Sequence, residues 1–180
     1  MSPPTTLTRI SVEVNGRALT RHVEPRRHLV DFLREDCGQT GSHLGCEHGV
    51  CGACTVRLDG EIVRGCLVLA VQADGRRVET VDTDAPSPAL RALQDAFIAR
   101  NALQCGYCTP GMLMAALDIV EHQPGANRDE VRHGISGNYC RCTGYHAIVD
   151  AVCDVLAALR EGRLGNAVGS APSTAQGAAA

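Results

Sequence analysis

Short alternations of apolar and polar residues, separated by turn signals, fill the first eighty residues of the chain. Two pairs of alternating runs flank an Asn-Gly or an Asp-Gly dipeptide: residues 7–14 with 17–23, and residues 55–58 with 61–63. Because these dipeptides adopt the positive φ angles of tight turns, each pair is predicted to form a β-hairpin.

The rest of this region fits a small α+β fold. Apolar residues within 28–35 have helical spacing, whereas residues 66–72 and 77–81 are predicted to form further short strands. A loop rich in Gly and Cys lies between the predicted helix and the second hairpin, so the region combines one sheet with one helix.

From residue 87 onward the apolar period becomes that of helices. Three helix-start signals are Ser87-Pro88, Thr109-Pro110, and Asn127 with Glu130 three residues later. Each places a capping side chain, a proline or a capping box where a first helical turn needs it. With a further helix over residues 144–159, the second region is predicted to be a four-helix bundle.

These patterns predict two domains. The expected divisions are 1–80 for the sheet domain, 81–88 for a polar linker, 89–162 for the helical domain and 163–180 for a flexible tail. The tail is rich in Gly, Ala and Ser and has no core pattern.

Composition excludes some classes of function. Lys and Arg total 17 against 20 acidic residues, and the chain has no Trp, so a nucleic-acid binder is not expected. The absence of a long apolar run predicts no membrane span and a cytoplasmic protein. Thiols stay reduced in the cytoplasm, so ten cysteines indicate metal binding rather than disulfides.

The first cysteine group surrounds a glycine-rich loop. Its members are Cys46, Cys51, Cys54 and Cys66. This is the spacing of plant-type [2Fe–2S] ferredoxins, and the loop glycines let backbone N–H groups approach a cluster. Four thiolates also suit zinc, which remains an alternative.

The second group stands before two predicted helices. Its members are Cys105, Cys108, Cys140 and Cys142. Helix N-termini favour a negatively charged centre such as a thiolate-bound cluster. Taken alone, this spacing also allows zinc or a redox dithiol.

Together the two groups resemble a known family. The segments GCEHGVCGACTV at 45–56, QCGYCTPGM at 104–112 and GNYCRCTGY at 137–145, with Cys66, are similar to the small iron–sulfur subunit of the xanthine dehydrogenase, aldehyde oxidoreductase and aerobic carbon monoxide dehydrogenase family. The similarity spans about residues 5 to 160 and includes every proposed ligand position.

The resemblance implies a non-catalytic electron-transfer subunit of a molybdenum hydroxylase. It implies a β-grasp ferredoxin domain, a four-helix bundle and two [2Fe–2S] clusters, with Gln104 and Cys142 placed against the pterin of a molybdenum cofactor. That cofactor and FAD would belong to a large subunit and a medium subunit. Electrons would pass from molybdenum to the second cysteine group, then to the first group, then to FAD or another acceptor.

Two alternatives remain at this stage. The chain could be a free-standing two-cluster ferredoxin or a zinc-stabilised interaction module, and metal content would separate these. For the whole enzyme, an aldehyde or an N-heteroaromatic substrate is favoured. Cys37 and Cys153, which lie outside both groups, are expected to be packing thiols.

Overall fold

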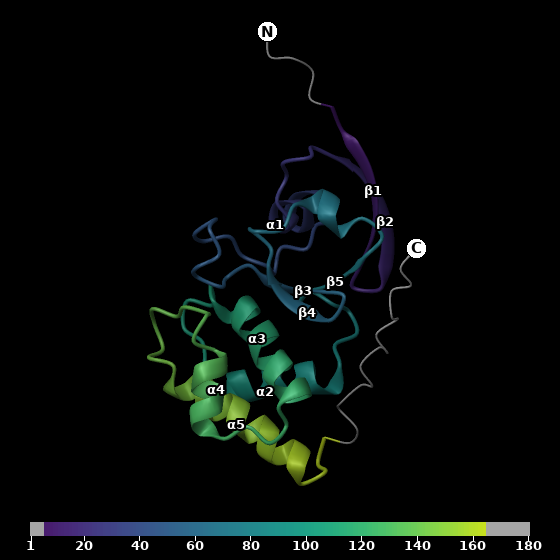
Figure 1. Ribbon diagram of the computed structural model, residues 1–180. Helices are drawn as coiled ribbons and strands as arrows, with labels where there is room; N and C mark the ends of the chain where they lie inside the picture. The colour runs from purple at the N-terminus through teal and green to yellow at the C-terminus, as the bar shows by residue number, and fades with distance from the viewer. Residues whose placement is uncertain (1–5, 165–180) are drawn as a thin grey trace, which may run out of the picture.

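The computed structural model describes residues 6–164 and contains a sheet region and a helical region. Most of the predicted tail, residues 165–180, lies outside the described residues. Figure 1 shows the sheet with α1 in its upper part and α2 to α5 below it. Within residues 6–164, no helix combines the length and apolar character needed to cross a bilayer.

The sheet region has five strands in the order β2-β1-β5-β3-β4. Their bounds are β1 Thr8–Val14, β2 Arg17–Val23, β3 Thr55–Leu58, β4 Glu61–Arg64 and β5 Arg77–Glu79. Strands β1 and β5 pair in parallel, and the other neighbours are antiparallel. The apolar positions of β1 are buried and its alternate positions are exposed, as the alternation predicted.

Both predicted hairpins are confirmed. Asn15-Gly16 joins β1 to β2 and Asp59-Gly60 joins β3 to β4, and all four residues have positive φ. Two successive positive φ angles are characteristic of a type I′ turn, whose twist matches that of the flanking strands.

Two short segments differ from the sequence prediction. The helix predicted over 28–35 is present, but it begins as α1 (Leu29–Asp31) and continues as a π-helix over Phe32–Asp36. The strand predicted over 66–72 is wrong, because this segment forms a turn followed by a 3₁₀ helix over Ala70–Ala73. The Gln72 side chain accepts the Leu69 N–H at 2.8 Å, which closes this single turn.

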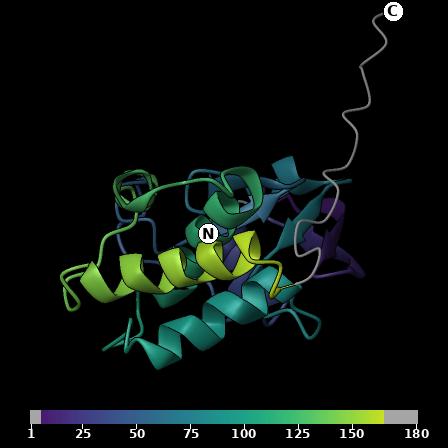
Figure 2. The same cartoon turned by 90° about the horizontal axis from the view of Figure 1, so that it is seen from below.

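Four helices form the second region and share one hydrophobic core. They are α2 Pro88–Ala99, α3 Thr109–His122, α4 Arg128–Gly134 and α5 His146–Arg160. Two predicted start signals are confirmed: Ser87 caps α2, and Asn127 with Glu130 forms a capping box on α4. Proline occupies the first turn of α3 as predicted, but the N-cap residue is Cys108 and Thr109 is already helical. Figure 2 shows α2 and α5 side by side, in agreement with their contacts.

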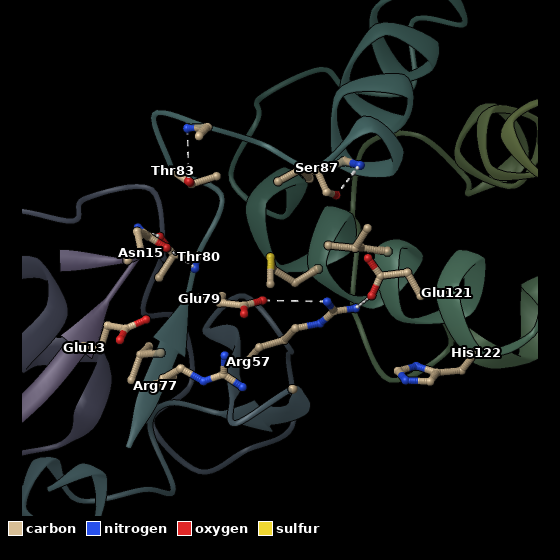
Figure 3. A pocket seen from close by; sticks show the side chains of 17 residues that line it. Glu13, Asn15, Arg57, Arg77, Glu79, Thr80, Thr83, Ser87, Glu121 and His122 are labelled. Atoms are coloured by element: carbon tan, nitrogen blue, oxygen red, sulfur yellow. Dashed lines mark hydrogen bonds and ion pairs between the residues drawn. The ribbon is translucent and has the colours of Figure 1, made fainter. Parts of the chain in front are cut away.

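Strand β3 is covered on both faces, because the sheet packs against α1 on one side and α3 on the other. Val56 and Leu58 belong to the sheet core, whereas Arg57 faces the helices. Figure 3 shows Arg57 reaching between Glu79 of β5 and Glu121 of α3. A cavity of about 610 Å³ adjoins this ion pair.

Candidate metal centres

The first cysteine group lies at one end of the sheet. Cys46, Cys51 and Cys54 come from an irregular loop that leads into β3, and Cys66 comes from the turn after β4. Gly49 and Gly52 of this loop have φ near +80°, a conformation that glycine adopts without strain. The loop can therefore curl tightly enough to bring three thiols together.

Backbone N–H groups point at the sulfurs of this group. The Gly49 N–H donates to the Cys66 Sγ at 3.3 Å, and the Cys51 N–H donates to the Cys46 Sγ at 3.4 Å. The N–H groups of Cys51 and then His48 lower the pKa of Cys46 to about 6. The loop thus stabilises a thiolate, which is the form that binds iron.

The four thiols of the first group form two close pairs. The Cys51 thiol is close enough to Cys46, and the Cys54 thiol is close enough to Cys66, to change the pKa of its neighbour. Burial, followed by the adjacent Cys54 thiol, raises the pKa of Cys66 to about 11. The Cys46–Cys51 pair is half-buried, and the Cys54–Cys66 pair is buried.

The second group has the same paired arrangement. The Sγ atoms of Cys105 and Cys142 are 3.5 Å apart, and the Cys140 thiol is close enough to Cys108 to change its pKa. Burial, followed by the Cys140 thiol, raises the pKa of Cys108 to about 12. Cys108 is the N-cap residue of α3, so this pair lies at a helix N-terminus.

This donor set fits a [2Fe–2S] cluster at each position. Such a cluster has two irons and four cysteine ligands, so two thiol pairs supply two ligands to each iron. Over residues 6–164, no three His, Cys, Asp or Glu side chains converge on a single point as one bound ion would require. The eight predicted ligands thus lie as four thiol pairs, two in each cysteine group.

The second group is exposed on one side only. Cys105 and Cys142 are exposed, whereas Cys140 is buried and Cys108 is half-buried. Gln104 lies beside the exposed pair, and its Nε2 donates to the Cys142 carbonyl at 3.1 Å. The outer pair and Gln104 therefore share a surface that is open to solvent in the free chain.

The inner side of the second group meets the loop of the first. The Tyr139 N–H donates to the Cys51 carbonyl at 2.8 Å, and Tyr139 directly precedes Cys140. The His43 ring stacks on Tyr107 with their centroids 4.7 Å apart, and the Tyr107 hydroxyl donates to the Leu44 carbonyl at 2.7 Å. The proposed ligands Cys51 and Cys140 are therefore linked through one hydrogen bond and the intervening residue Tyr139.

Sequence reasoning missed three polar residues that lie near the second group. The Thr143 hydroxyl donates to the Cys140 Sγ at 3.1 Å, and the Tyr145 hydroxyl accepts the Cys140 N–H at 2.9 Å. The third, Asn138, is buried between the two regions. Tyr145 has a φ of 67°, which is uncommon for a bulky residue and gave no signal in the sequence.

The two remaining cysteines are packing thiols, as predicted. Cys37 packs against the sheet core and Cys153 against the helical core. Burial raises the pKa of both, to about 11 for Cys37. Both thiols are therefore protonated at neutral pH and poorly reactive.

Comparison with known proteins agrees with this geometry. One family model, described as a 2Fe-2S iron-sulfur cluster binding domain, matches residues 12–79. A second, described as a [2Fe-2S] binding domain, matches residues 78–153. The nicotine 6-hydroxylase small subunit of Paenarthrobacter nicotinovorans is 51% identical over 163 residues, which cover 91% of this chain and 95% of that subunit. This chain belongs to the small iron–sulfur subunits of the molybdenum hydroxylases.

Two solved structures resemble this chain, one over nearly the whole of a chain and one over a small part of a longer chain. A chain of quinoline 2-oxidoreductase from Pseudomonas putida 86 superposes with a TM-score of 0.81 at 52% identity, covering 87% of the iron–sulfur subunit and 98% of that chain. Aldehyde oxidoreductase from Desulfovibrio gigas gives 0.78 at 33% identity, covering 92% of the subunit but only 19% of the longer chain.

Proposed function

We propose that this chain is the electron-transfer subunit of a multi-subunit molybdenum hydroxylase and performs no substrate chemistry itself. The observation that carries this proposal is the paired arrangement of eight cysteines in two groups, joined by the hydrogen bond between Tyr139 and Cys51. Two [2Fe–2S] clusters, when bound, each accept and release one electron. The chain's own contribution is to hold them at fixed positions and to set their surroundings.

Each cysteine has one proposed role as an iron ligand. Cys46 with Cys51, and Cys54 with Cys66, would hold the two irons of the first cluster. Cys105 with Cys142, and Cys108 with Cys140, would hold those of the second. The N–H groups directed at Cys46 and Cys66 stabilise the charge on these sulfurs. The Thr143 hydroxyl does the same for Cys140.

The exposure of the ligands supports a direction of transfer. The exposed pair Cys105 and Cys142, with Gln104 beside it, would face the molybdopterin of a large subunit. The inner pair contacts the loop of the first group through Tyr139. Exposed apolar side chains of Val50 and Leu67 flank the first group and would meet the next acceptor, an FAD subunit.

The relatives support a class of substrate for the whole enzyme. Two of the proteins compared above are named for nicotine and quinoline, which are both N-heteroaromatic compounds. We therefore favour hydroxylation of an N-heteroaromatic compound over that of an aldehyde. Substrate contacts would lie on the large subunit.

We also propose the domain limits and the compartment. A sheet domain over 1–80, a linker over 81–88 and a four-helix bundle over 89–162 are supported by the two family models, which meet at residues 78–79. None of the ten cysteines forms a disulfide, which suits a reducing compartment and supports the cytoplasm.

Metal analysis and spectroscopy test the proposed function. The chain, purified anaerobically with its co-purifying partners, is expected to contain about four irons per chain, since two clusters of two irons are bound. After chemical reduction, electron paramagnetic resonance should show two distinct signals. A colourless zinc protein, or a single signal at full iron content, would refute the proposal.

A further inference from the structure

The contact between the two cysteine groups is built from two short segments. Residues 51–55 of the first loop lie against residues 137–139, which directly precede Cys140. Each segment contains or adjoins a proposed iron ligand. Whatever fixes this contact therefore fixes the separation of the two clusters.

Asn138 makes the central polar interaction of this contact. Its side chain is buried, with the residue 3% exposed, and its Nδ2 donates to the Gly52 carbonyl at 2.9 Å and to the Thr55 Oγ1 at 3.1 Å. The Thr55 hydroxyl in turn donates to the Gly52 carbonyl at 2.6 Å. Both hydrogens of the Asn138 side-chain amide, which belongs to the helical region, are thus bonded to atoms of the sheet region.

The backbones at this contact approach closely enough to exclude larger residues. A Cβ atom on Gly52 would lie 2.6 Å from the Gly137 carbonyl oxygen, and Gly52 also has a φ of +75°. A Cβ atom on Gly111, three residues after Cys108, would lie 2.2 Å from the Gly52 carbonyl oxygen. Besides the Asn138 amide, the Arg64 guanidinium enters the contact, where its Nη2 donates to the Gly137 carbonyl at 2.8 Å and its Nη1 donates to the Thr55 hydroxyl.

We propose that Asn138 is a positioning residue that sets the distance between the two clusters and thereby controls electron transfer between them. This inference rests on the proposed function. Asn138 contributes no iron ligand, and its two hydrogen bonds cross the contact rather than supporting either cysteine group from within. Loss of these bonds should separate the groups without removing either cluster.

The physical reason is that the Asn138 amide uses its NH₂ end, which donates, for both hydrogen bonds across the contact. Asn138→Asp keeps the shape of the side chain but replaces the NH₂ donor by an acceptor, which then faces the Gly52 carbonyl oxygen. Two acceptors that face each other repel, and a buried carboxylate is costly to desolvate, so the two segments should move apart to admit water. The exposed Asn101 lies away from this contact, and Asn101→Asp makes the same atomic change as a matched control.

The experiment compares wild type, Asn138→Asp and Asn101→Asp in the purified complex. Thr55→Val is a milder second variant that removes one of the two acceptors. The first measurement is the magnetic interaction between the two reduced clusters, which falls with the inverse cube of their separation. The second is the rate at which an electron redistributes between the clusters after partial reduction, and the third is hydrogen exchange at the Tyr139 amide.

In Asn138→Asp we expect both signals at full iron content, a weaker magnetic interaction, a several-fold slower redistribution and faster exchange at Tyr139. Thr55→Val should show smaller changes in the same direction, and Asn101→Asp should match wild type. If Asn138→Asp does not load iron, Thr55→Val decides alone.

Unchanged magnetic interaction and redistribution in the loaded variants would overturn the role of Asn138 and leave the proposed function intact. A wild-type complex without two signals would refute the proposed function, and the positioning role with it. The two failures are therefore distinguishable.

Discussion

Arg57 is a charged side chain held almost entirely away from water at the junction of sheet and helices. Its Nη2 lies 2.6 Å from the Glu121 Oε2, and its Nη1 lies 3.7 Å from the Glu79 Oε2. A buried ion pair gains little over apolar packing, but removal of one partner leaves a charge that is poorly compensated. The stability of the fold therefore depends on Glu121, which compensates the buried charge of Arg57.

Glu121→Gln should lower the free energy of unfolding by about 3 kcal/mol, because it leaves the buried guanidinium with only the more distant Glu79. Urea unfolding of equally iron-loaded samples measures this difference. The control is Asp84→Asn, which removes the exposed ion pair with Arg17 and should cost less than about 1 kcal/mol. Equal losses in the two variants would contradict this account.

At the residue scale, the sequence predicts which cysteines lie together better than it predicts the residues that support them. Cysteine spacing predicted both groups of four because several ligands of one cluster must come from short segments. Asn138 gave no such signal, because its partners Gly52 and Thr55 lie more than eighty residues away in the chain. Their proximity depends on how the two regions pack.

Among the elements, those with local signals were predicted well. Both hairpins and the helices α2 to α5 follow from turn dipeptides, caps and apolar spacing, which act within a few residues. The segment 66–72 was mistaken for a strand because its apolar residues suit either structure. The segment adopts a 3₁₀ helix because Gln72 closes the turn and because Ala70 and Ala73 are buried.

Helix α4 is short, so its first turn should depend strongly on its cap. The Asn127 side chain accepts the N–H groups of Asp129 and Glu130 at 2.9 and 3.1 Å. Asn127→Ala should cost about 1 kcal/mol, seen as faster hydrogen exchange across α4. Ser136→Ala, at an exposed position beyond the helix, should leave exchange in α4 unchanged. Unaltered exchange in Asn127→Ala would show that packing alone holds the helix.

Across the whole molecule, the two cysteine groups differ in their access to solvent. The second group presents Cys105 and Cys142 at the surface, whereas the first group keeps Cys54 and Cys66 buried. A partner covering Gln104 and the exposed pair would remove this difference. The free chain and the assembled enzyme should therefore respond differently to agents that remove iron.

An iron chelator added to the chain expressed without partners should abolish the signal of the second cluster before that of the first. In the purified complex, both signals should persist much longer under the same conditions, because the partner covers the exposed pair. Time courses followed by electron paramagnetic resonance measure both rates. Earlier loss of the first signal would contradict the exposure argument.

The close approach of Gly52, Gly111 and Gly137 also limits how such proteins can be recombined. The sheet region and the helical region look like separate modules, yet each presents a surface shaped for the other to within the volume of a methyl group. A chimera that takes one half from a distant relative would inherit only one side of that match. Exchange of a region between such chains should therefore succeed only where the residues on both sides of this contact come from the same parent.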